Sequence, residues 1–307
     1  MTDEKTAMKA GYVAVVGRPN VGKSTLINTL LDQKIAAVSP KPQTTRRKQL
    51  GILTRPGEMQ LVFVDTPGIH KAQHKLGDYM NDEAMSSLAD ADVVLWLLAA
   101  DEDLTAEDKL IAEKLGAIRR LPPVLMALSK VDSVNEADLE KRKQAAIELF
   151  PARDVLEFSS MQHKGLEELL GSLLQFVPEG EPFFDEDTVT DYYEKDIAAE
   201  LIRESALFFL RDEVPHCLAV RMDEYTERGE KGAFIEATYF VERESQKGIV
   251  IGQGGEMLKK IGTRARQEIE SMSGREVYLS LRVKVNKNWR NSPEALHLLG
   301  YEKESDK

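Results

Sequence analysis

Cysteine and long apolar runs are what this sequence has least of. Its 307 residues include a single cysteine, Cys217, so an internal disulfide is excluded and a reducing compartment is indicated. No apolar stretch approaches the roughly 20 residues that a membrane-spanning helix needs, and residues 1–10 lack the apolar core of a secretory signal. We therefore expect a cytoplasmic protein and keep open a peripheral contact with the inner face of the cell membrane.

Positive charge is scarce over the whole chain but gathers in one region. The formal net charge is −11, which disfavours indiscriminate binding to nucleic acid. From Arg243 to Arg290, however, eleven Lys or Arg residues stand against five Glu, a local excess of six positive charges. The chain is long enough for two domains, and the second half has room for a basic surface of its own.

A glycine-rich motif at residues 17–24 is the most specific signal in the sequence. It follows the apolar run 12–16, a predicted buried strand, and precedes residues 25–31, whose apolar spacing predicts a helix. Gly-x-x-x-x-Gly-Lys-Ser in this setting is a phosphate-binding P-loop, although a glycine turn that only joins strand to helix is the alternative. Lys23 is expected to reach the β- and γ-phosphates and Ser24 to bind Mg²⁺. The motif predicts nucleotide contacts from Gly17, Arg18, Pro19, Asn20, Val21, Gly22, Lys23, Ser24 and Thr25.

Two further motifs complete a predicted nucleotide switch. The polar loop 40–47 contains Thr44 and Thr45, either of which can complete the Mg²⁺ shell, and we favour Thr45. Asp65 closes a predicted strand, where a carboxylate can hold the metal through water, and the Gly68 N–H can meet the γ-phosphate. The predicted contacts of this second motif are Asp65, Thr66, Pro67, Gly68 and Ile69, and the predicted metal ligands are Ser24, Thr45 and Asp65.

The order of apolar segments in the first half predicts an α/β fold. Strands and helices alternate there, which indicates a mostly parallel sheet with helices on both faces. Nucleotides bind at the carboxyl edge of such a sheet. The expected strands are 48–53, 60–64, 93–98, 124–128 and 155–158, and the expected helices are 77–88, 106–115, 138–150 and 166–176.

Polar residues after two of these strands predict a guanine site. The Asp132 carboxylate can accept hydrogen bonds from the guanine N1–H and 2-amino group, which adenine does not offer, and the Lys130 stem can cover the base. Backbone N–H groups after the next strand can bind guanine O6. The predicted base contacts are Ser129, Lys130, Val131, Asp132, Ser159, Ser160 and Met161.

The second half carries the signature of a nucleic-acid cleft. A proline- and acid-rich stretch at 178–190 predicts a linker. It is followed by a predicted helix at 197–210, strands at 217–222 and 233–241 joined by the turn 226–229, two helices around a Gly-x-x-Gly loop, and a strand at 276–285. A Gly-x-x-Gly loop between helices is the RNA clamp of KH domains, although such a loop alone is usually a turn. The predicted RNA contacts are Ile249, Val250, Ile251, Gly252, Gln253, Gly254, Gly255, Lys259 and Lys260.

These motifs together resemble the Era family of ribosome-assembly GTPases over nearly the whole chain. The resemblance is carried by Gly-Arg-Pro-Asn-Val-Gly-Lys-Ser-Thr, by Pro-Gln-Thr-Thr-Arg, by residues 241–252 and by the tail 288–301. It implies a P-loop GTPase domain at 11–177 followed by a smaller α+β KH domain of type II at 191–301, with a flexible N-terminus at 1–10 and a tail at 302–307. It also implies GTP hydrolysis with Mg²⁺, binding to the 3′ end of 16S ribosomal RNA and a role in assembly of the 30S subunit.

The chain departs from the family pattern at three positions, and a fourth position, Ile69, sets it apart from Ras-type GTPases. Ser129 replaces an Asn and is expected to weaken contacts with guanine N7 and with the phosphate loop, whereas Ser160 replaces an Ala at little cost. Gln253 replaces a basic residue of the loop. Ile69 replaces the water-orienting glutamine of Ras-type GTPases, and related GTPases of that kind use the asparagine at the Asn20 position to hold an activating K⁺.

We therefore expect Lys23, Thr45, Gly68 and Asn20 to carry catalysis, with K⁺ as an optional activator and Asn20 as a mere loop brace the alternative. Three rival functions remain open at this point: a GTP-gated RNA-binding module with negligible turnover, a peripheral membrane regulatory GTPase and, least favoured, an ATPase.

Overall fold

The computed structural model describes residues 8–39, 41–229 and 232–301 of the chain. Residues 1–7 and 302–307, which fall in the predicted N-terminal segment and tail, lie outside the described residues. The first strand already begins at Lys9, two residues before the predicted start of the first domain.

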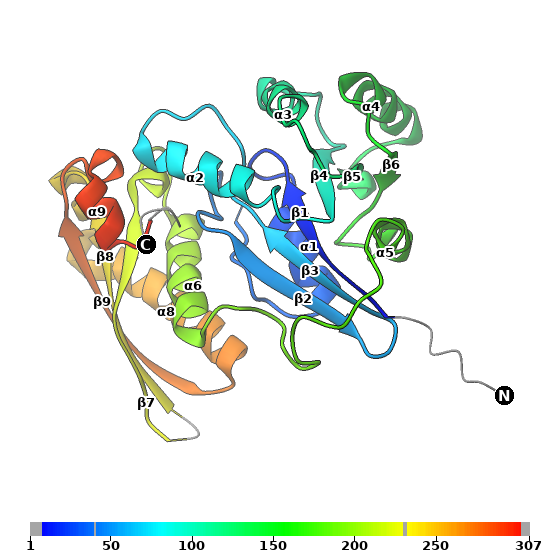
Figure 1. The fold of residues 1–307 in the computed structure, drawn as a ribbon. Coiled ribbons are helices and arrows are strands. Elements are labelled where there is room, and N and C mark those ends of the chain that lie inside the picture. Colours follow the sequence, from blue (N-terminus) through cyan, green and yellow to red (C-terminus); the bar gives the residue numbers. More distant parts are fainter. Residues whose placement is uncertain (1–7, 40, 230–231, 302–307) are drawn as a thin grey trace. The chain divides into compact units, whose positions relative to one another are not determined.

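The described residues form two compact units (Figure 1). The first unit holds the chain up to Ala36 together with Thr45–Lys71 and Met80–Asp191. The second unit holds Ala37–Thr44 and Ala72–Tyr79 in addition to the chain from Tyr192 onwards. Two short segments of the N-terminal half therefore belong to the second unit, which the sequence pattern does not reveal.

A six-stranded sheet forms the centre of the first unit, in the order β2-β3-β1-β4-β5-β6 (Figure 1). All neighbouring strands run parallel except β2, which pairs antiparallel with β3. The loops that follow β1, β3, β5 and β6 therefore gather at one edge of the sheet. The strands are β1 (Lys9–Val16), β2 (Gln49–Arg55), β3 (Met59–Asp65), β4 (Val93–Ala99), β5 (Val124–Ser129) and β6 (Asp154–Glu157).

Helices cover both faces of this sheet because its strands are apolar on both sides. Val13 and Val15 of β1 point into one core with α1 and α5, whereas Ala14 and Val16 point into a second core with α2, α3 and α4. Strands buried on both faces are typical of parallel sheets. The helices are α1 (Lys23–Leu31), α2 (Lys75–Ser86), α3 (Ala106–Gly116), α4 (Glu136–Leu149) and α5 (Leu166–Leu174).

The predicted linker is tied to the first unit along much of its length. Gln60, which is fully buried in β3, accepts hydrogen bonds from the Phe183 and Phe184 N–H groups at 2.7 and 3.0 Å. The Ile52 N–H of β2 donates to the Val189 carbonyl oxygen at 2.9 Å. The segment therefore covers the edge strand β2, whose main-chain groups would otherwise be open to other strands.

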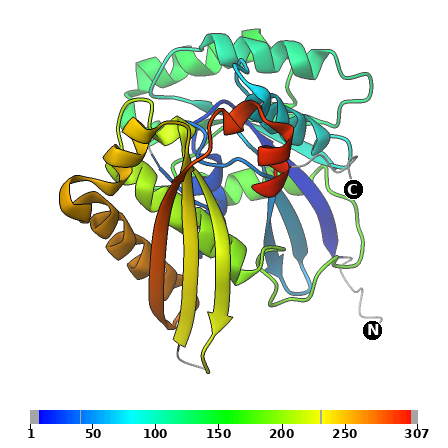
Figure 2. The ribbon, with the colours of Figure 1, turned by 90° about the vertical axis from the view of Figure 1, so that its left-hand side faces the viewer.

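The second unit has the element order that the sequence predicts. Its sheet runs β7-β8-β9, with β7 antiparallel and β9 parallel to β8. Its core joins that sheet to α6 and α8, and Figure 2 shows the three strands with these helices behind them. The elements are α6 (Glu194–Phe209), β7 (Ala219–Glu227), β8 (Gly232–Val241), α7 (Glu244–Ile251), α8 (Glu256–Ser273), β9 (Glu276–Val285) and α9 (Pro293–Leu298).

Strand β7 differs from its predicted range by two residues at its start and by five at its end. Strand β7 begins at Ala219 rather than at Cys217, which ends a short 3-10 turn. It continues to Glu227, so Thr226 belongs to the strand and not to the turn. The reason is pairing with β8, which extends as far as Glu227 opposite Ala233 and outweighs the polar composition of this stretch.

Candidate nucleotide site and RNA cleft

The phosphate loop connects β1 to α1, as its motif predicts. Gly17 has φ +152° and Gly22 has φ +99°. A Cβ atom on Gly17 would lie 2.7 Å from the Leu97 carbonyl oxygen. Gly22 is the N-cap of α1, so the main-chain N–H groups of this helix start face the loop, where an anion is favoured.

Lys23 is buried at the base of this loop. Its ammonium donates to the Gly17 and Arg18 carbonyl oxygens at 3.1 and 3.0 Å. Burial lowers the pKa of Lys23 to about 8, while the charge of Asp65 opposes that shift. Phosphate groups bound in the loop would place further negative charge beside this buried ammonium and so favour its charged form.

The three predicted metal ligands converge within the first unit. The Ser24 hydroxyl donates to Asp65 Oδ2 at 2.6 Å, and the Thr45 hydroxyl lies 3.3 Å from the same oxygen and 2.9 Å from Ser24 Oγ. Burial raises the pKa of Asp65, and its Oδ1 is buried without a hydrogen-bond partner among the described residues. Two hydroxyls and a carboxylate form an all-oxygen donor set, which fits Mg²⁺ together with phosphate and water.

Thr44 is placed differently from Thr45. Its hydroxyl donates to the Lys41 carbonyl oxygen at 2.8 Å and lies 3.1 Å from Ser39 Oγ. The geometry therefore favours Thr45 as the threonine that meets the metal.

We predict that Thr45→Ala lowers the Mg²⁺-dependent rate of GTP hydrolysis by about 100-fold, because a ligand of the ion that neutralises phosphate charge is lost. The matched variant Thr44→Ala is expected to change the rate by less than about fivefold. Single-turnover release of phosphate at saturating Mg²⁺ measures both. Equal losses in the two variants would contradict the assignment.

The second switch motif packs against the phosphate loop. The Thr66 hydroxyl donates to the Val15 carbonyl oxygen at 2.7 Å, and the Ile69 N–H donates to the Gly17 carbonyl oxygen at 3.2 Å. A Cβ atom on Gly68 would lie 2.6 Å from the Pro19 nitrogen, so only glycine fits there. The Ile69 side chain is fully buried and has no polar atom to orient water.

The predicted base-reading residues meet at the same edge of the sheet. Asp132 follows β5, and hydrogen bonds from Ser159 and Ser133 lower its pKa, so the carboxylate is charged, as a predicted acceptor for guanine N–H groups requires. The Lys130 ammonium lies 3.0 Å from Asp101, while Met161 is 80% exposed. Ser160 follows β6, so its main-chain N–H lies at this edge.

Ser129 keeps a contact that its short side chain was expected to weaken. Its buried hydroxyl donates to the Val21 carbonyl oxygen of the phosphate loop at 2.6 Å and lies 3.1 Å from the Leu98 carbonyl oxygen. The link between the base-reading segment and the phosphate loop is therefore present with serine. A hydroxyl has one proton, so this bond occupies it.

In the second unit the Gly-x-x-Gly loop opens a groove. Gly252 has φ +74°, and a Cβ atom there would lie 2.7 Å from Met257 Cβ, whereas Gly254 and Gly255 face open space. A cavity of about 410 Å³ follows this loop, between α8 and β9. Its lining residues are Gly255, Leu258, Lys259, Gly262, Thr263, Arg266, Leu279 and Leu281.

The lining only partly matches the predicted RNA contacts. Lys259 and Lys260 are exposed on α8, and Ile249 is 48% exposed at the end of α7. Val250, by contrast, is fully buried in the core of the second unit, so its side chain does not line the groove. Ile251 packs partly against the same core, and Gln253 is exposed within the loop.

Comparison with known proteins identifies the chain. A family model described as a 50S ribosome-binding GTPase matches residues 12–130, and a KH domain model matches residues 213–290. A crystal structure of Era with MgGDPNP and nucleotides 1506–1542 of 16S ribosomal RNA is 39% identical, with a TM-score of 0.91 over 96% of this chain and 100% of that one. The chain belongs to the Era family. A crystal structure of a point variant of Aquifex aeolicus Era bound to GDP·AlF4⁻ matches with the same identity, TM-score and coverage.

This Era-family chain is therefore a GTPase with a P-loop domain and a KH domain, as the sequence predicts. The Era structure with MgGDPNP supports Mg²⁺ as the metal. None of the helices in the described ranges combines the length and hydrophobicity that a bilayer crossing requires.

Several residues that line the cleft of this Era-family chain are not among the RNA contacts predicted from the sequence. Leu258, Gly262 and Arg266 recur at helical spacing on α8, and Leu279 and Leu281 alternate along β9. The helical spacing on α8 and the alternation along β9 are the sequence features that could have indicated these lining residues. Which face of α8 looks toward β9 depends on packing, because a helix and a strand far apart in sequence have no local reason to face each other.

Proposed function

We propose that this chain couples GTP hydrolysis to binding of the 3′ end of 16S ribosomal RNA during assembly of the 30S subunit. The observation that carries the proposal is the presence, in one chain, of a Mg²⁺-competent phosphate loop and a Gly-x-x-Gly cleft with the same fold as Era. Era itself has been crystallised with MgGDPNP and a segment of 16S ribosomal RNA. A role on ribosomal subunits assigns the chain to the cytoplasm, and contact with the membrane surface stays a prediction.

The residues of the first unit act by positioning and charge. Main-chain N–H groups of the phosphate loop and Lys23 bind the phosphates of GTP, and Gly68 N–H meets the γ-phosphate. Ser24, Thr45 and Asp65 would hold Mg²⁺, which supplies charge neutralisation when bound. Ile69 offers no base or water-orienting group, so the rate depends on electrostatic stabilisation of the transition state.

In the second unit the cleft fits single-stranded RNA. The backbone can approach Gly254 and Gly255 closely because no side chain intervenes. Bases can lie against the apolar walls Leu279 and Leu281, while Lys259 and Arg266 supply positive charge. KH domains clamp about four nucleotides in this manner.

A monovalent cation is the further element that we propose for catalysis. Asn20 has φ +64° and lies in the phosphate loop. We predict about tenfold faster hydrolysis in K⁺ than in Na⁺, a difference of about 1.4 kcal/mol in the barrier. Asn20→Gly, which tolerates the positive φ, is expected to remove that difference. Equal rates of the unmodified protein in the two salts would remove the cation from the mechanism.

Crosslinking in cells tests the proposed RNA target. Sequencing of the RNA attached to the full chain, with and without a non-hydrolysable GTP analogue supplied to permeabilised cells before crosslinking, is expected to recover the 3′ end of 16S ribosomal RNA. Reads spread over unrelated transcripts, or confined to another part of the ribosome, would contradict the target.

A further inference from the structure

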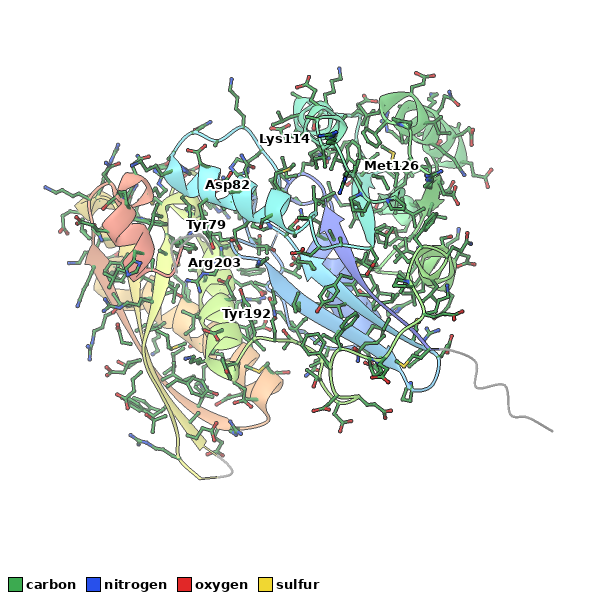
Figure 3. All side chains as sticks on the ribbon, in the orientation of Figure 1. Tyr79, Asp82, Lys114, Met126, Tyr192 and Arg203 are labelled. Atoms are coloured by element: carbon green, nitrogen blue, oxygen red, sulfur yellow. The ribbon has the colours of Figure 1, made fainter. Side chains whose placement is uncertain are left out.

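Two buried charged side chains lie next to each other on α6, outside the nucleotide site and the RNA cleft. Arg203 is 1% exposed and Glu204 is 3% exposed, and Figure 3 labels Arg203 on this helix. Charged side chains are rarely buried to this degree unless they are paired and hydrogen-bonded. Their partners therefore indicate what the buried pair is for.

Both side chains bind main-chain groups of the loop Ala37–Thr44. Glu204 Oε2 accepts a hydrogen bond from the Val38 N–H at 3.1 Å. Arg203 Nη1 donates to the Gln43 carbonyl oxygen at 3.3 Å, and Glu200 pairs with the same guanidinium. Hydrogen bonds to charged groups are stronger and more directional than neutral ones. The two neighbours thus hold the loop near its two ends, one through an N–H and the other through a carbonyl.

Hydrogen bonds also join residues within the loop between these anchors. The Lys41 N–H donates to Ser39 Oγ at 3.0 Å, and Thr44 Oγ1 lies 3.1 Å from Ser39 Oγ while it donates to the Lys41 carbonyl oxygen. Together with the anchors at Val38 and Gln43, these hydrogen bonds hold the described residues of the loop in place. Thr45 is the next residue of the chain, so the position of the loop limits where its hydroxyl can go.

A third charged residue connects this arrangement to the helix of the RNA cleft. Arg264 Nη2 lies 3.7 Å from Glu204 Oε1, whereas the other carboxylate oxygen, Oε2, binds Val38. Arg264 also lies 3.1 Å from Glu268 and over the Phe208 ring at 4.3 Å. Its neighbours on α8, Thr263 and Arg266, line the cleft. Glu204 therefore contacts the loop with one oxygen and the cleft helix with the other.

We propose that Arg203 and Glu204 are positioning residues for GTP hydrolysis, and that the Arg264–Glu204 ion pair makes the position of the Ala37–Thr44 loop depend on RNA in the cleft. The proposal rests on the proposed RNA-binding function and names the residues that link it to turnover. A shift of α8 when RNA binds changes the distance from Arg264 to Glu204, and with it the anchor of Val38. By linkage, the nucleotide bound in the first unit changes RNA affinity by the same factor by which RNA changes nucleotide affinity.

Four variants of the full chain separate the parts of this arrangement. Glu204→Gln keeps an oxygen for the Val38 N–H but loses the charge that faces Arg264, and Arg264→Met removes that charge from the other side. Glu204→Leu removes the carboxylate and with it the contacts with both Val38 and Arg264. Glu268→Gln is the matched control, because it changes another ion-pair partner of Arg264 and leaves Glu204 intact.

The experiment measures three quantities for each variant. The first measurement gives kcat and KM for GTP without RNA. The second gives kcat and KM with a saturating oligoribonucleotide that copies nucleotides 1506–1542 of 16S ribosomal RNA. The third is the ratio of RNA affinities with a non-hydrolysable GTP analogue and with GDP. Circular dichroism melting of each variant reports whether the fold is retained.

We expect RNA to change kcat of the unmodified chain at least about threefold. In Glu204→Gln and in Arg264→Met, RNA should change kcat by less than about 1.5-fold. The ratio of RNA affinities with the GTP analogue and with GDP should also lie within about 1.5-fold of one, and kcat without RNA should change less than about threefold. A fifth chain that combines Glu204→Gln with Arg264→Met should match either single variant, because each substitution removes the same ion pair. Glu204→Leu should in addition lower kcat without RNA by about tenfold at unchanged KM, and Glu268→Gln should behave as the unmodified chain.

Several outcomes would overturn the inference. One is an RNA response that persists in both Glu204→Gln and Arg264→Met, and a second is a response lost equally in Glu268→Gln. Additive losses when the two substitutions are combined would show that Glu204 and Arg264 do not act as a pair. An unmodified chain that binds RNA without any change in kcat would show that RNA does not affect turnover. Absence of RNA binding by the unmodified chain would instead reject the proposed function. In that case kcat of Glu204→Leu without RNA still decides whether the carboxylate positions the loop.

Discussion

Asp132→Asn is expected to abolish the preference for guanine and to create a preference for xanthine. The carboxylate of Asp132 is predicted to accept from two donors on the edge of guanine, and a hydrogen bond from Ser159 holds its pKa below the usual value. An amide presents an N–H₂ group to those donors, which leaves polar groups of the site and of the base unpaired. Sites of this kind discriminate by about 10⁴-fold, so GTP affinity should fall by at least about 10³-fold while xanthosine triphosphate binds and is hydrolysed.

The control for this prediction is Asp138→Asn. Asp138 also follows β5 in the chain, its side chain is 46% exposed, and it accepts from the Asn135 side chain at the start of α4. Its replacement should leave the ratio of kcat/KM for the two nucleotides unchanged. If Asp132→Asn retains GTP over xanthosine triphosphate, Asp132 is not the residue that reads the base.

Gly254→Asp is expected to weaken binding of single-stranded RNA by at least about 100-fold, or about 2.7 kcal/mol, and to leave GTP hydrolysis without RNA unchanged. Gly254 has φ +59° and faces open space in the loop that precedes the cleft. A carboxylate there occupies the space that the RNA backbone needs and repels its phosphates. Fluorescence anisotropy with a labelled oligoribonucleotide measures the loss, and single-turnover hydrolysis gives the control activity.

The chain offers a closely matched control in Gly229→Asp. Gly229 has φ +70°, faces open space and belongs to the same unit, but it follows β7 and lies outside the Gly-x-x-Gly loop. Both substitutions add the same charge and the same backbone strain. Loss of RNA affinity in Gly254→Asp but not in Gly229→Asp therefore reports the cleft, whereas equal losses would contradict the KH assignment.

Much of the nucleotide site follows from local spacing. The phosphate loop at 17–24 needs a strand before it, a helix after it and glycines between them. All three features can be predicted from one short run of consecutive residues. The base-reading residues after β5 and β6 need only the rule that parallel strands end at one edge. For the same reason the alternating segments predicted the α/β class, and the helix-strand-strand-helix-helix-strand order predicted the KH unit.

Other features were beyond the sequence because they join residues far apart in the chain. The contact between Ser129 and Val21 depends on how the sheet brings two loops together, and a comparison of side-chain lengths gave the wrong expectation. Val250 is apolar on a helix beside the cleft, and only packing decided that it enters the core. The acidic, proline-bearing segment 178–190 has linker composition, yet buried Gln60 gives its main chain hydrogen-bond partners.

What the sequence determined by itself is the chemistry. The phosphate loop and the Gly-x-x-Gly loop are each made of neighbours along the chain, whereas the predicted metal ligands and guanine contacts lie on separate loops that the order of parallel strands brings to one edge of the sheet. The tertiary structure decided which of two adjacent threonines faces Ser24 and Asp65. It also buried Arg203 and Glu204 against the loop before that threonine. The physical reason is that a short motif fixes its own backbone, whereas the burial of a charge depends on partners that only the folded chain brings near.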